Sequence, residues 1–243
     1  MNNHLLLTHI RGALIRLEET IIFSLLERAQ FKRNRAAYDS GALGDMFGAE
    51  SLVEYMLHET EKIHAGMRRY TSPDEHPFFS DLPEPLLQPL RYHENPLVKN
   101  TVNLNHELLR AYTDILIPAL CAEGDDAQYG STAVCDVACL QALSKRIHYG
   151  KFVAESKYQA EPERYTTLIA AGDRHGLADA ITDDAVEEAL FQRVAKKAGS
   201  YSGMFLDPQS AKNFQTTVTA IYRDIIIPLT KRVEVDYLLT GKR

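Results

Sequence analysis

The chain has 243 residues, of which 45% are hydrophobic, and a formal net charge of −6 with a pI near 5.9. This length and apolar content can build the core of one large domain. No linker interrupts the helical patterns, so we expect a single domain over residues 1–243. The acidic balance argues against a general nucleic-acid binder, because such proteins need a basic surface to displace phosphate counterions.

The N-terminus and the cysteines bear on the compartment. His9, Arg11 and Arg16 break the first apolar run before it reaches the length of a signal peptide or a membrane span. The three cysteines follow no disulfide-framework spacing and are read as small core residues, namely Cys121, Cys135 and Cys139. We therefore expect a cytoplasmic protein with no membrane partner, and a secreted form whose leader has been removed stays open.

Hydrophobic periodicity predicts helices along the chain and no strands, because apolar residues recur at steps of three and four. A proline-rich connector over 72–89 follows the second predicted helix, and Ser72 and Pro73 within it resemble the capped start of a helix. In chain order, the predicted helices cover 4–30, 50–70 and 105–118, then a long helix from 131 that includes 146 and 157, then 162–172, 183–198 and 208–237.

Capping residues and prolines set the expected boundaries. Asn105 and Asp183 are placed to cap helix N-termini, and Gly172 suits the left-handed conformation that ends a helix. Pro228 is expected to kink the last helix, because it removes one backbone donor. The predicted fold class is all-α, a single-domain bundle of long helices with shorter connecting helices.

Two basic residues, Arg146 and Lys157, are the most informative feature of the sequence. They lie eleven residues apart, and eleven steps along an α-helix return to within about 20° of the starting direction. Ile147, Phe152 and Val153 place that stripe near a buried face. Cations that point toward a core need anions, and a substrate can be one of them.

Further polar residues interrupt apolar stripes elsewhere, namely Arg11, Glu187, Thr230 and Glu234. Each of them alone is explained by a surface charge, an intrahelical ion pair or a snorkelling side chain. No metal site is expected, since His58 and His64 are six residues apart and share no helical face. No P-loop, GxSxG or strand-linked GxGxxG occurs, which favours binding or cofactor-free catalysis.

Several segments resemble the fungal and plant type of chorismate mutase, the all-helical branch of that family. The resemblance covers nearly the whole chain, in order, and is carried by IRGALIRLEETIIFSLLERAQF, RRYTSPDEHPFF, LQALSKRIHYGKFVAESKYQ, ITDDAVEEALFQRVAKKA and IIIPLTKRVEVDYLL. The resemblance implies an isomerase of aromatic amino acid biosynthesis. It would convert chorismate to prephenate by a Claisen rearrangement without a cofactor, so positioning and electrostatics must supply the catalysis.

The resemblance also assigns roles to residues. Arg11 and Arg146 would hold the substrate carboxylates, and the Thr230 hydroxyl would be a further donor. Lys157 and a protonated Glu234 would meet the ether oxygen, with the pKa of Glu234 raised by burial. Glu187 would accept a hydrogen bond from the ring hydroxyl.

Asp183 lies at a position where the yeast enzyme of the family has asparagine. We expect it to contact the substrate through its backbone amide; if its side chain took part instead, the added negative charge would weaken binding of a dianion. The resemblance further implies a homodimer regulated by tyrosine and tryptophan, with effector-site elements around 68–79 and 124–135. Arg68, Arg69, Gly130 and Ser131 match the residues of that site. Ala127, Gln128 and Val134 depart from the yeast pattern, which leaves open which amino acid is recognised. Surface ion pairs are the alternative explanation for Arg68 and Arg69.

Two other functions stay open at this point. One is a non-catalytic helical dimer that acts as an amino-acid sensor or an interaction module. The other is a secreted mutase that depletes the chorismate of a host. Retention of all six polar positions from Arg11 to Glu234 argues against the first, because a scaffold does not need convergent buried charge.

Overall fold

A computed structural model describes residues 7–88, 90 and 95–241. These residues form helices and no strand, which confirms the all-α prediction. The α-helices are α1 (Leu7–Arg28), α2 (Leu52–Gly66), α3 (Asn105–Ala111), α4 (Ile117–Leu120), α5 (Tyr129–His148), α6 (Gly150–Ala160), α7 (Pro162–Ala170), α8 (Arg174–Ile181), α9 (Asp184–Ser202), α10 (Pro208–Ile221) and α11 (Ile227–Thr240). Short 3-10 turns cover Arg35–Ala37, Asp45–Phe47 and Arg69–Thr71.

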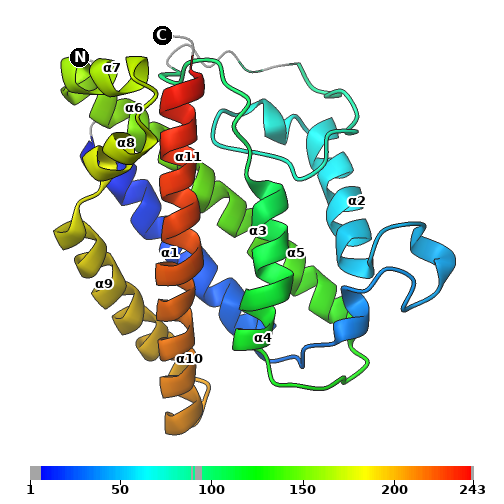
Figure 1. Cartoon of the computed structure of the whole chain (residues 1–243). Coiled ribbons are helices and arrows are strands. Elements are labelled where there is room, and N and C mark those ends of the chain that lie inside the picture. The colour runs from blue at the N-terminus through cyan, green and yellow to red at the C-terminus, as the bar shows by residue number, and fades with distance from the viewer. Residues whose placement is uncertain (1–6, 89, 91–94, 242–243) are drawn as a thin grey trace.

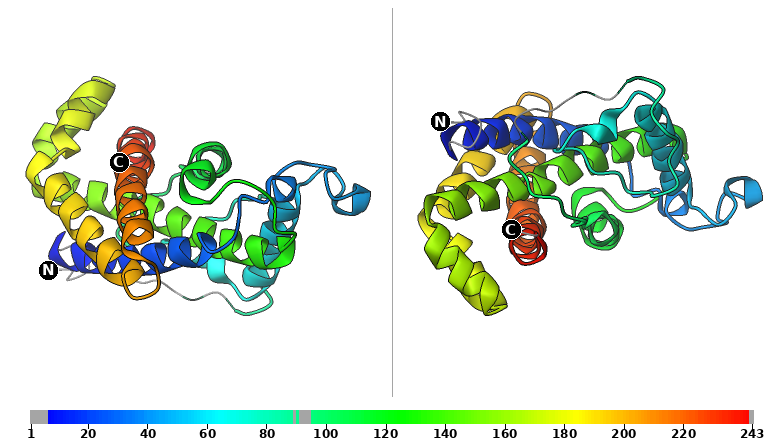
Figure 2. Two further views of the ribbon diagram at one scale, coloured as in Figure 1. Left: turned by 90° about the horizontal axis from the view of Figure 1, so that it is seen from below. Right: turned by 90° about the horizontal axis from the view of Figure 1, so that it is seen from above.

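Two long helical rods organise the bundle, and each consists of two successive helices. Helices α5 and α6 follow one another and cross the molecule behind α11, while α1 packs along α5 (Figure 1). Helices α10 and α11 form the second rod, and α9 packs against α10 on the side away from α2. Helices α7 and α8 project at the end of the bundle that also holds the start of α1 (Figure 2). The polar positions singled out in the sequence lie toward this end.

Two prolines lie inside helical rods, and each follows a π-helical turn. The turns cover Tyr112–Leu116 and Tyr222–Ile226 and precede Pro118 and Pro228. In a π turn the backbone N–H bonds five residues back, so the chain bulges where the proline removes a donor. The helix predicted to end near Pro118 therefore continues to Leu120, and the last helical run passes Pro228 directly after the π turn at Tyr222–Ile226.

Two capping predictions were wrong. Ser72 and Pro73 lie in a turn with no helix after it. Asn105 is the first helical residue of α3 rather than its cap, and its side-chain amide donates to the carbonyls of His76 and Pro77, both at 2.9 Å. It therefore ties the connector to α3, because a long-range partner outcompetes the local capping bond.

Other boundaries differ by small steps. The helix expected from Ser131 begins at Tyr129, and it divides at Tyr149 into α5 and α6. Helix α8 was not predicted. By contrast, Asp183 caps α9 by accepting from the Val186 N–H at 3.1 Å, and Gly172 follows α7 with a φ of 63°, as expected.

A buried polar cluster joins α1 to α5 within the main core. Asp136, which is fully buried, accepts from Arg28 Nε at 2.7 Å, from the Tyr112 hydroxyl at 2.6 Å and from the Tyr38 hydroxyl at 2.7 Å. The carboxylate is thus satisfied by a cation and two neutral donors, as a buried charge requires. The hydrophobic pattern gave no sign of this cluster.

A close approach between α6 and α11 positions the site. A Cβ atom placed on Gly150 would lie 3.0 Å from both the Thr230 carbonyl oxygen and Thr230 Cγ2, and 3.1 Å from Glu234 Cγ. These distances are at the lower limit for carbon, so a side chain here would push the two helices apart. Glycine at this position therefore lets Thr230 and Glu234 lie directly against the helix between Arg146 and Lys157.

We predict that Gly150→Ala lowers the free energy of unfolding by about 1 to 3 kcal/mol, the usual cost of overpacking. Chemical denaturation measures this change. Gly130→Ala is the matched control, since nothing lies within 4 Å of its Cβ position in α5. It should be stabilising by about 0.5 to 1 kcal/mol, because alanine is the better helix former. Equal stability of the Gly150 variant and the native protein would show that the helices are not in close contact there.

Candidate active site

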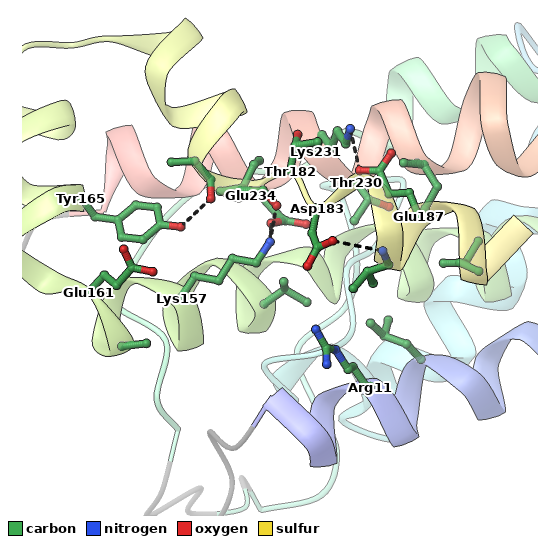
Figure 3. A pocket seen from close by; sticks show the side chains of 18 of the residues that line it. Arg11, Lys157, Glu161, Tyr165, Thr182, Asp183, Glu187, Thr230, Lys231 and Glu234 are labelled. Carbon is green, nitrogen blue, oxygen red and sulfur yellow. Dashed lines mark hydrogen bonds and ion pairs between the residues drawn. The ribbon is translucent and has the colours of Figure 1, made fainter.

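A cavity of about 320 Å³ opens where α1, α6, α9 and α11 meet (Figure 3). It is lined by every residue that the sequence indicated for catalysis or substrate binding, namely Arg11, Arg146, Lys157, Asp183, Glu187, Thr230 and Glu234. They come from five helices and one cap and span more than two hundred residues of the chain. The fold thus gathers these side chains in one place.

Arg146 lies at the base of the cavity. Its side chain is 2% exposed, and Nη1 donates to Thr230 Oγ1 at 3.4 Å. Its Nε atom is buried and has no hydrogen-bond partner among the described residues, and no carboxylate there pairs with it. Burial lowers the pKa of this guanidinium, yet arginine stays charged at neutral pH. A buried cation with unused donors lines a space that a small anion can fill.

Lys157 extends across the cavity toward α11. Its ammonium donates to the Ile181 carbonyl at the end of α8 and lies 3.7 Å from Glu234 Oε2 (Figure 3). The stripe shared with Arg146 therefore faces one cavity, as helical geometry indicated. Both cations reach this cavity, although the helix is divided into α5 and α6 at a point between Arg146 and Lys157.

Glu234 is the buried carboxyl of the site. It is 6% exposed, and its Oε2 atom is buried without a hydrogen bond in the described structure. Burial raises the pKa of Glu234 to about 7, and the charges of Lys157, Arg146 and Lys231 oppose that rise. The carboxyl can therefore carry a proton near neutral pH and act as a hydrogen-bond donor.

Glu187 and Asp183 lie at the start of α9, where the helix N-terminus favours negative charge. Glu187 pairs with Lys231 of α11 at 2.6 Å. Asp183 is exposed, and its carboxylate is engaged by the Val186 N–H. Lys231 was not singled out from the sequence, since it follows Thr230 in a run of charged residues and its partner lies 44 positions away.

The remaining walls come from α1, α7 and α8. Arg11 is exposed on α1 and points into the cavity from the side opposite α11 (Figure 3). Tyr165 of α7 is 2% exposed and donates from its hydroxyl to the Ala180 carbonyl at 3.0 Å, which holds α8 over Lys157. Sequence reasoning missed Tyr165, because its role depends on α8.

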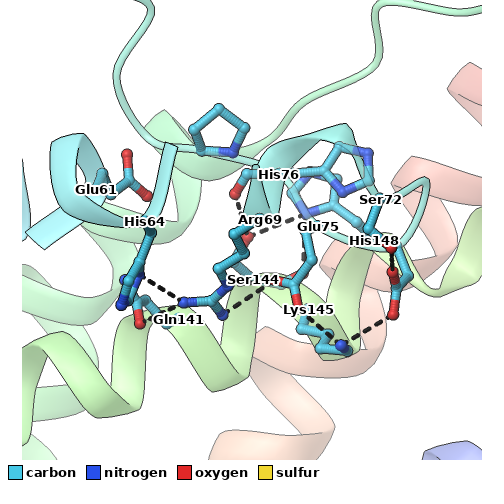
Figure 4. A network of polar contacts seen from close by, with 12 residues as sticks. Glu61, His64, Arg69, Ser72, Glu75, His76, Gln141, Ser144, Lys145 and His148 are labelled. Atoms are coloured by element: carbon cyan, nitrogen blue, oxygen red, sulfur yellow. Dashed lines mark hydrogen bonds and ion pairs between the residues drawn. The ribbon is translucent and has the colours of Figure 1, made fainter. Parts of the chain in front are cut away.

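The four residues expected at an effector site are not gathered in this chain. Arg69 binds Glu75 at 3.0 Å and Gln141 of α5 at 2.8 Å (Figure 4), while Arg68 donates to the Gln88 carbonyl. Gly130 and Ser131 lie exposed in the first turn of α5. Eleven residues separate Gly130 from Gln141, a distance of about 16 Å along the helix axis. Arg69 and the start of α5 therefore lie apart in the single chain.

Two histidines and the three cysteines bear on whether the chain could hold a metal ion or a disulfide. His58 lies between Glu50 and Asp81, and His64 contacts Arg69. The three cysteines are free thiols. Within residues 7–88, 90 and 95–241, no group of three acidic, histidine or cysteine side chains is arranged to hold a metal. In the same part of the chain, no helix combines the length and the apolar character needed to cross a bilayer.

Comparisons with known proteins identify the family. The profile of chorismate mutase type II matches residues 128–235. Chorismate mutase of Schizosaccharomyces pombe is 49% identical over 245 residues, which cover 98% of this chain and 97% of that protein. The crystal structure of Aro7p chorismate mutase from Candida albicans, in complex with L-Trp, superposes with a TM-score of 0.91 at 40% identity, covering 97% of this chain and 91% of that one.

A second solved structure is also similar in fold. AtCM1 with tyrosine bound in its allosteric site superposes with a TM-score of 0.86 at 47% identity, covering 98% of this chain and 97% of that one. The helical fold, the cavity and these similarities all indicate the same family. The chain belongs to the chorismate mutase family, in its all-helical type II branch.

Proposed function

We propose that the protein converts chorismate to prephenate in the synthesis of phenylalanine and tyrosine. The observation that carries this proposal is the buried guanidinium of Arg146, which has no carboxylate partner and shares one cavity with Lys157 and Glu234. Chorismate is a dianion, and its two carboxylates would supply the missing negative charge. The reaction needs no covalent intermediate, so a positioned set of charges is sufficient for catalysis.

The substrate would be held in its folded form by cations on opposite walls. Arg146 and Arg11 would bind the carboxylates, with Thr230 as an additional donor. Glu187, held by Lys231 at 2.6 Å, would accept a hydrogen bond from the ring hydroxyl. The side chain of Asp183 is used to cap α9, which supports contact with the substrate through its backbone amide.

The breaking bond would be stabilised from two sides. Negative charge grows on the ether oxygen as the carbon–oxygen bond lengthens, and the Lys157 ammonium would lie beside it. Glu234, 3.7 Å from Lys157 Nζ, would donate its proton as a hydrogen bond to the same oxygen. These two interactions strengthen in the transition state, so they act on the rate rather than on binding alone.

Regulation and assembly form a second part of the proposal. The two halves of the effector site would meet across a homodimer, with Arg68 and Arg69 of one copy facing Gly130 and Ser131 of the other. Exposed apolar side chains near these segments support such a contact, namely Ile63, Met67, Leu86 and Val134. Free thiols are consistent with a cytoplasmic protein.

We predict that Arg146→Ala loses about a hundredfold to a thousandfold in turnover, the effect of removing about 3 to 4 kcal/mol of transition-state stabilisation. The loss of chorismate absorbance measures it. KM should rise as well, whereas Lys157→Ala should act mainly on kcat. Arg232→Ala is the control, because Arg232 lies on α11 with a half-exposed side chain paired to Glu107. Near-normal activity of the Arg146 variant would contradict the assignment, and an inactive native protein would favour a non-catalytic sensor or interaction module.

A second prediction concerns pH. The free enzyme should keep Glu234 protonated below about 7, so kcat/KM should be level there and should fall as the pH rises through 7. Bound substrate adds negative charge and should move the fall in kcat to higher pH. Glu234→Gln, a permanently neutral donor, should abolish this descending limb. If the variant keeps the same limb, another group titrates.

A third prediction tests regulation. Addition of tyrosine, tryptophan or phenylalanine should change the rate of chorismate loss, and Arg68→Ala should weaken the response to the active amino acid by tenfold or more while the basal rate stays. The expected size corresponds to about 1.4 kcal/mol, a modest value for a charged hydrogen bond. An unchanged response in the variant would remove Arg68 from the effector site.

A further inference from the structure

A second, larger cavity lies between residues 70–77 and 95–103. Its volume is about 530 Å³, and Lys151 of α6 forms part of its wall. None of the proposed catalytic residues lines it, nor do Arg68, Arg69, Gly130 and Ser131, although residues 70–77 belong to the segment 68–79 expected near an effector site. The lining combines apolar side chains such as Leu97 and Val98 with hydroxyl and amide groups, namely Thr71, Ser72, Asn95, Asn100, Thr101 and Asn103.

Lys151 is a buried cation that pairs with no carboxylate in the part of the chain that the structure describes. It is 3% exposed, and its ammonium donates to the Val102 carbonyl at 2.6 Å and contacts His76 Nε2 at 2.7 Å. No carboxylate among the described residues forms an ion pair with it. Burial lowers the pKa of Lys151 to about 8, so the side chain is still charged at pH 7. Such a charge is costly unless an anion compensates it.

The contact with Lys151 determines the tautomer of His76. An ammonium has no lone pair, so His76 Nε2 must be the acceptor, and the proton of the neutral ring must be on Nδ1. Burial and the nearby His148 and Lys151 lower the pKa of His76 to about 2, which keeps the ring neutral. Its Nδ1 atom is buried and has no hydrogen-bond partner among the described residues.

The ring beneath His76 cannot accept this proton. His148 stacks on His76 with 4.3 Å between the ring centres (Figure 4). Its Nε2 accepts from the Leu104 N–H at 2.9 Å, and its Nδ1 donates to the Ser144 carbonyl at 2.9 Å. Both nitrogens of His148 are therefore used, and its ring only supports the position of His76.

Glu75 directly precedes His76 in the sequence, but its charge is already neutralised by two cations. It lines the same cavity but pairs with Arg69 at 3.0 Å and with Lys145 at 2.7 Å, and Lys145 also pairs with Asp74 at 2.9 Å (Figure 4). These two cations and two carboxylates balance one another. Lys151 therefore has no ion-pair partner among the described residues, and hydrogen bonds there to Val102 and His76 occupy two of its three ammonium N–H groups.

We propose that this cavity binds a monoanionic organic carboxylate, whose oxygens pair with the Lys151 ammonium. A single charge favours a carboxylate over a phosphate dianion. The volume and the apolar part of the lining favour a body larger than acetate. This site does not depend on the catalytic function, since it shares no residue with it.

The test follows the titration of Lys151 itself, in the full chain labelled with ¹³C-lysine, by the ¹³Cε shift in NMR. Lys151→Arg identifies the signal. Benzoate is the probe, compared with chloride and with inorganic phosphate at equal ionic strength. Benzoate should raise the pKa of Lys151 by about one unit or more, in a saturable way, which corresponds to a tenfold preference for the charged amine. Lys145, already paired with Asp74 and Glu75, should not respond.

Two variants make the result specific. Arg146→Ala removes the buried cation of the active site. The benzoate response of Lys151 should be unchanged in this variant, because the proposal places benzoate in the other cavity. His76→Phe preserves a ring on His148 but removes the Nε2 acceptor that orients the Lys151 ammonium, and it should weaken benzoate binding severalfold. No shift of Lys151 at saturating benzoate would overturn the proposal. A larger shift with phosphate than with benzoate would overturn the choice of a carboxylate.

Discussion

The close contact between α6 and α11 is the constraint on which the site depends. A Cβ atom on residue 150 would lie 3.0 Å from the Thr230 carbonyl oxygen, so only glycine leaves room for this contact. Thr230 and Glu234 therefore pack directly against α6, part of the rod formed by α5 and α6. Arg146 and Lys157 flank this point on the same rod. The donors and the buried carboxyl are therefore held at fixed separations by backbone packing rather than by flexible loops, which is the preorganisation that electrostatic catalysis needs.

The same packing places charges where folding alone would not favour them. A buried guanidinium without a carboxylate and a buried carboxyl with a raised pKa both reduce the stability of the empty protein. The Arg28 and Asp136 pair shows the contrast, since there the chain provides a complete set of partners. Incomplete pairing thus distinguishes a site built for a ligand from a structural polar cluster. By that criterion the cavity at Lys151 would also be a ligand site, separate from the active site.

Much of the architecture was readable from local pattern. Regular helical geometry places Arg146 and Lys157 on one face and Thr230 one turn from Glu234, and capping chemistry located the start of α9 at Asp183. Predictions failed where a distant partner decided the local outcome. Asn105 binds the connector instead of capping α3. Helix α8 is short and weakly patterned, and it was missed.

The sequence by itself determined the helical class, the extent of most helices and the set of polar residues that a fold would have to explain, because helix periodicity and capping depend on neighbours within a few positions. The tertiary structure alone decided which of those residues meet. It paired Lys231 with Glu187, brought Tyr165 and α8 over Lys157, and left Arg146 and Lys151 without a carboxylate partner among the described residues. Burial and pairing arise from the packing of distant helices, and no local pattern encodes them.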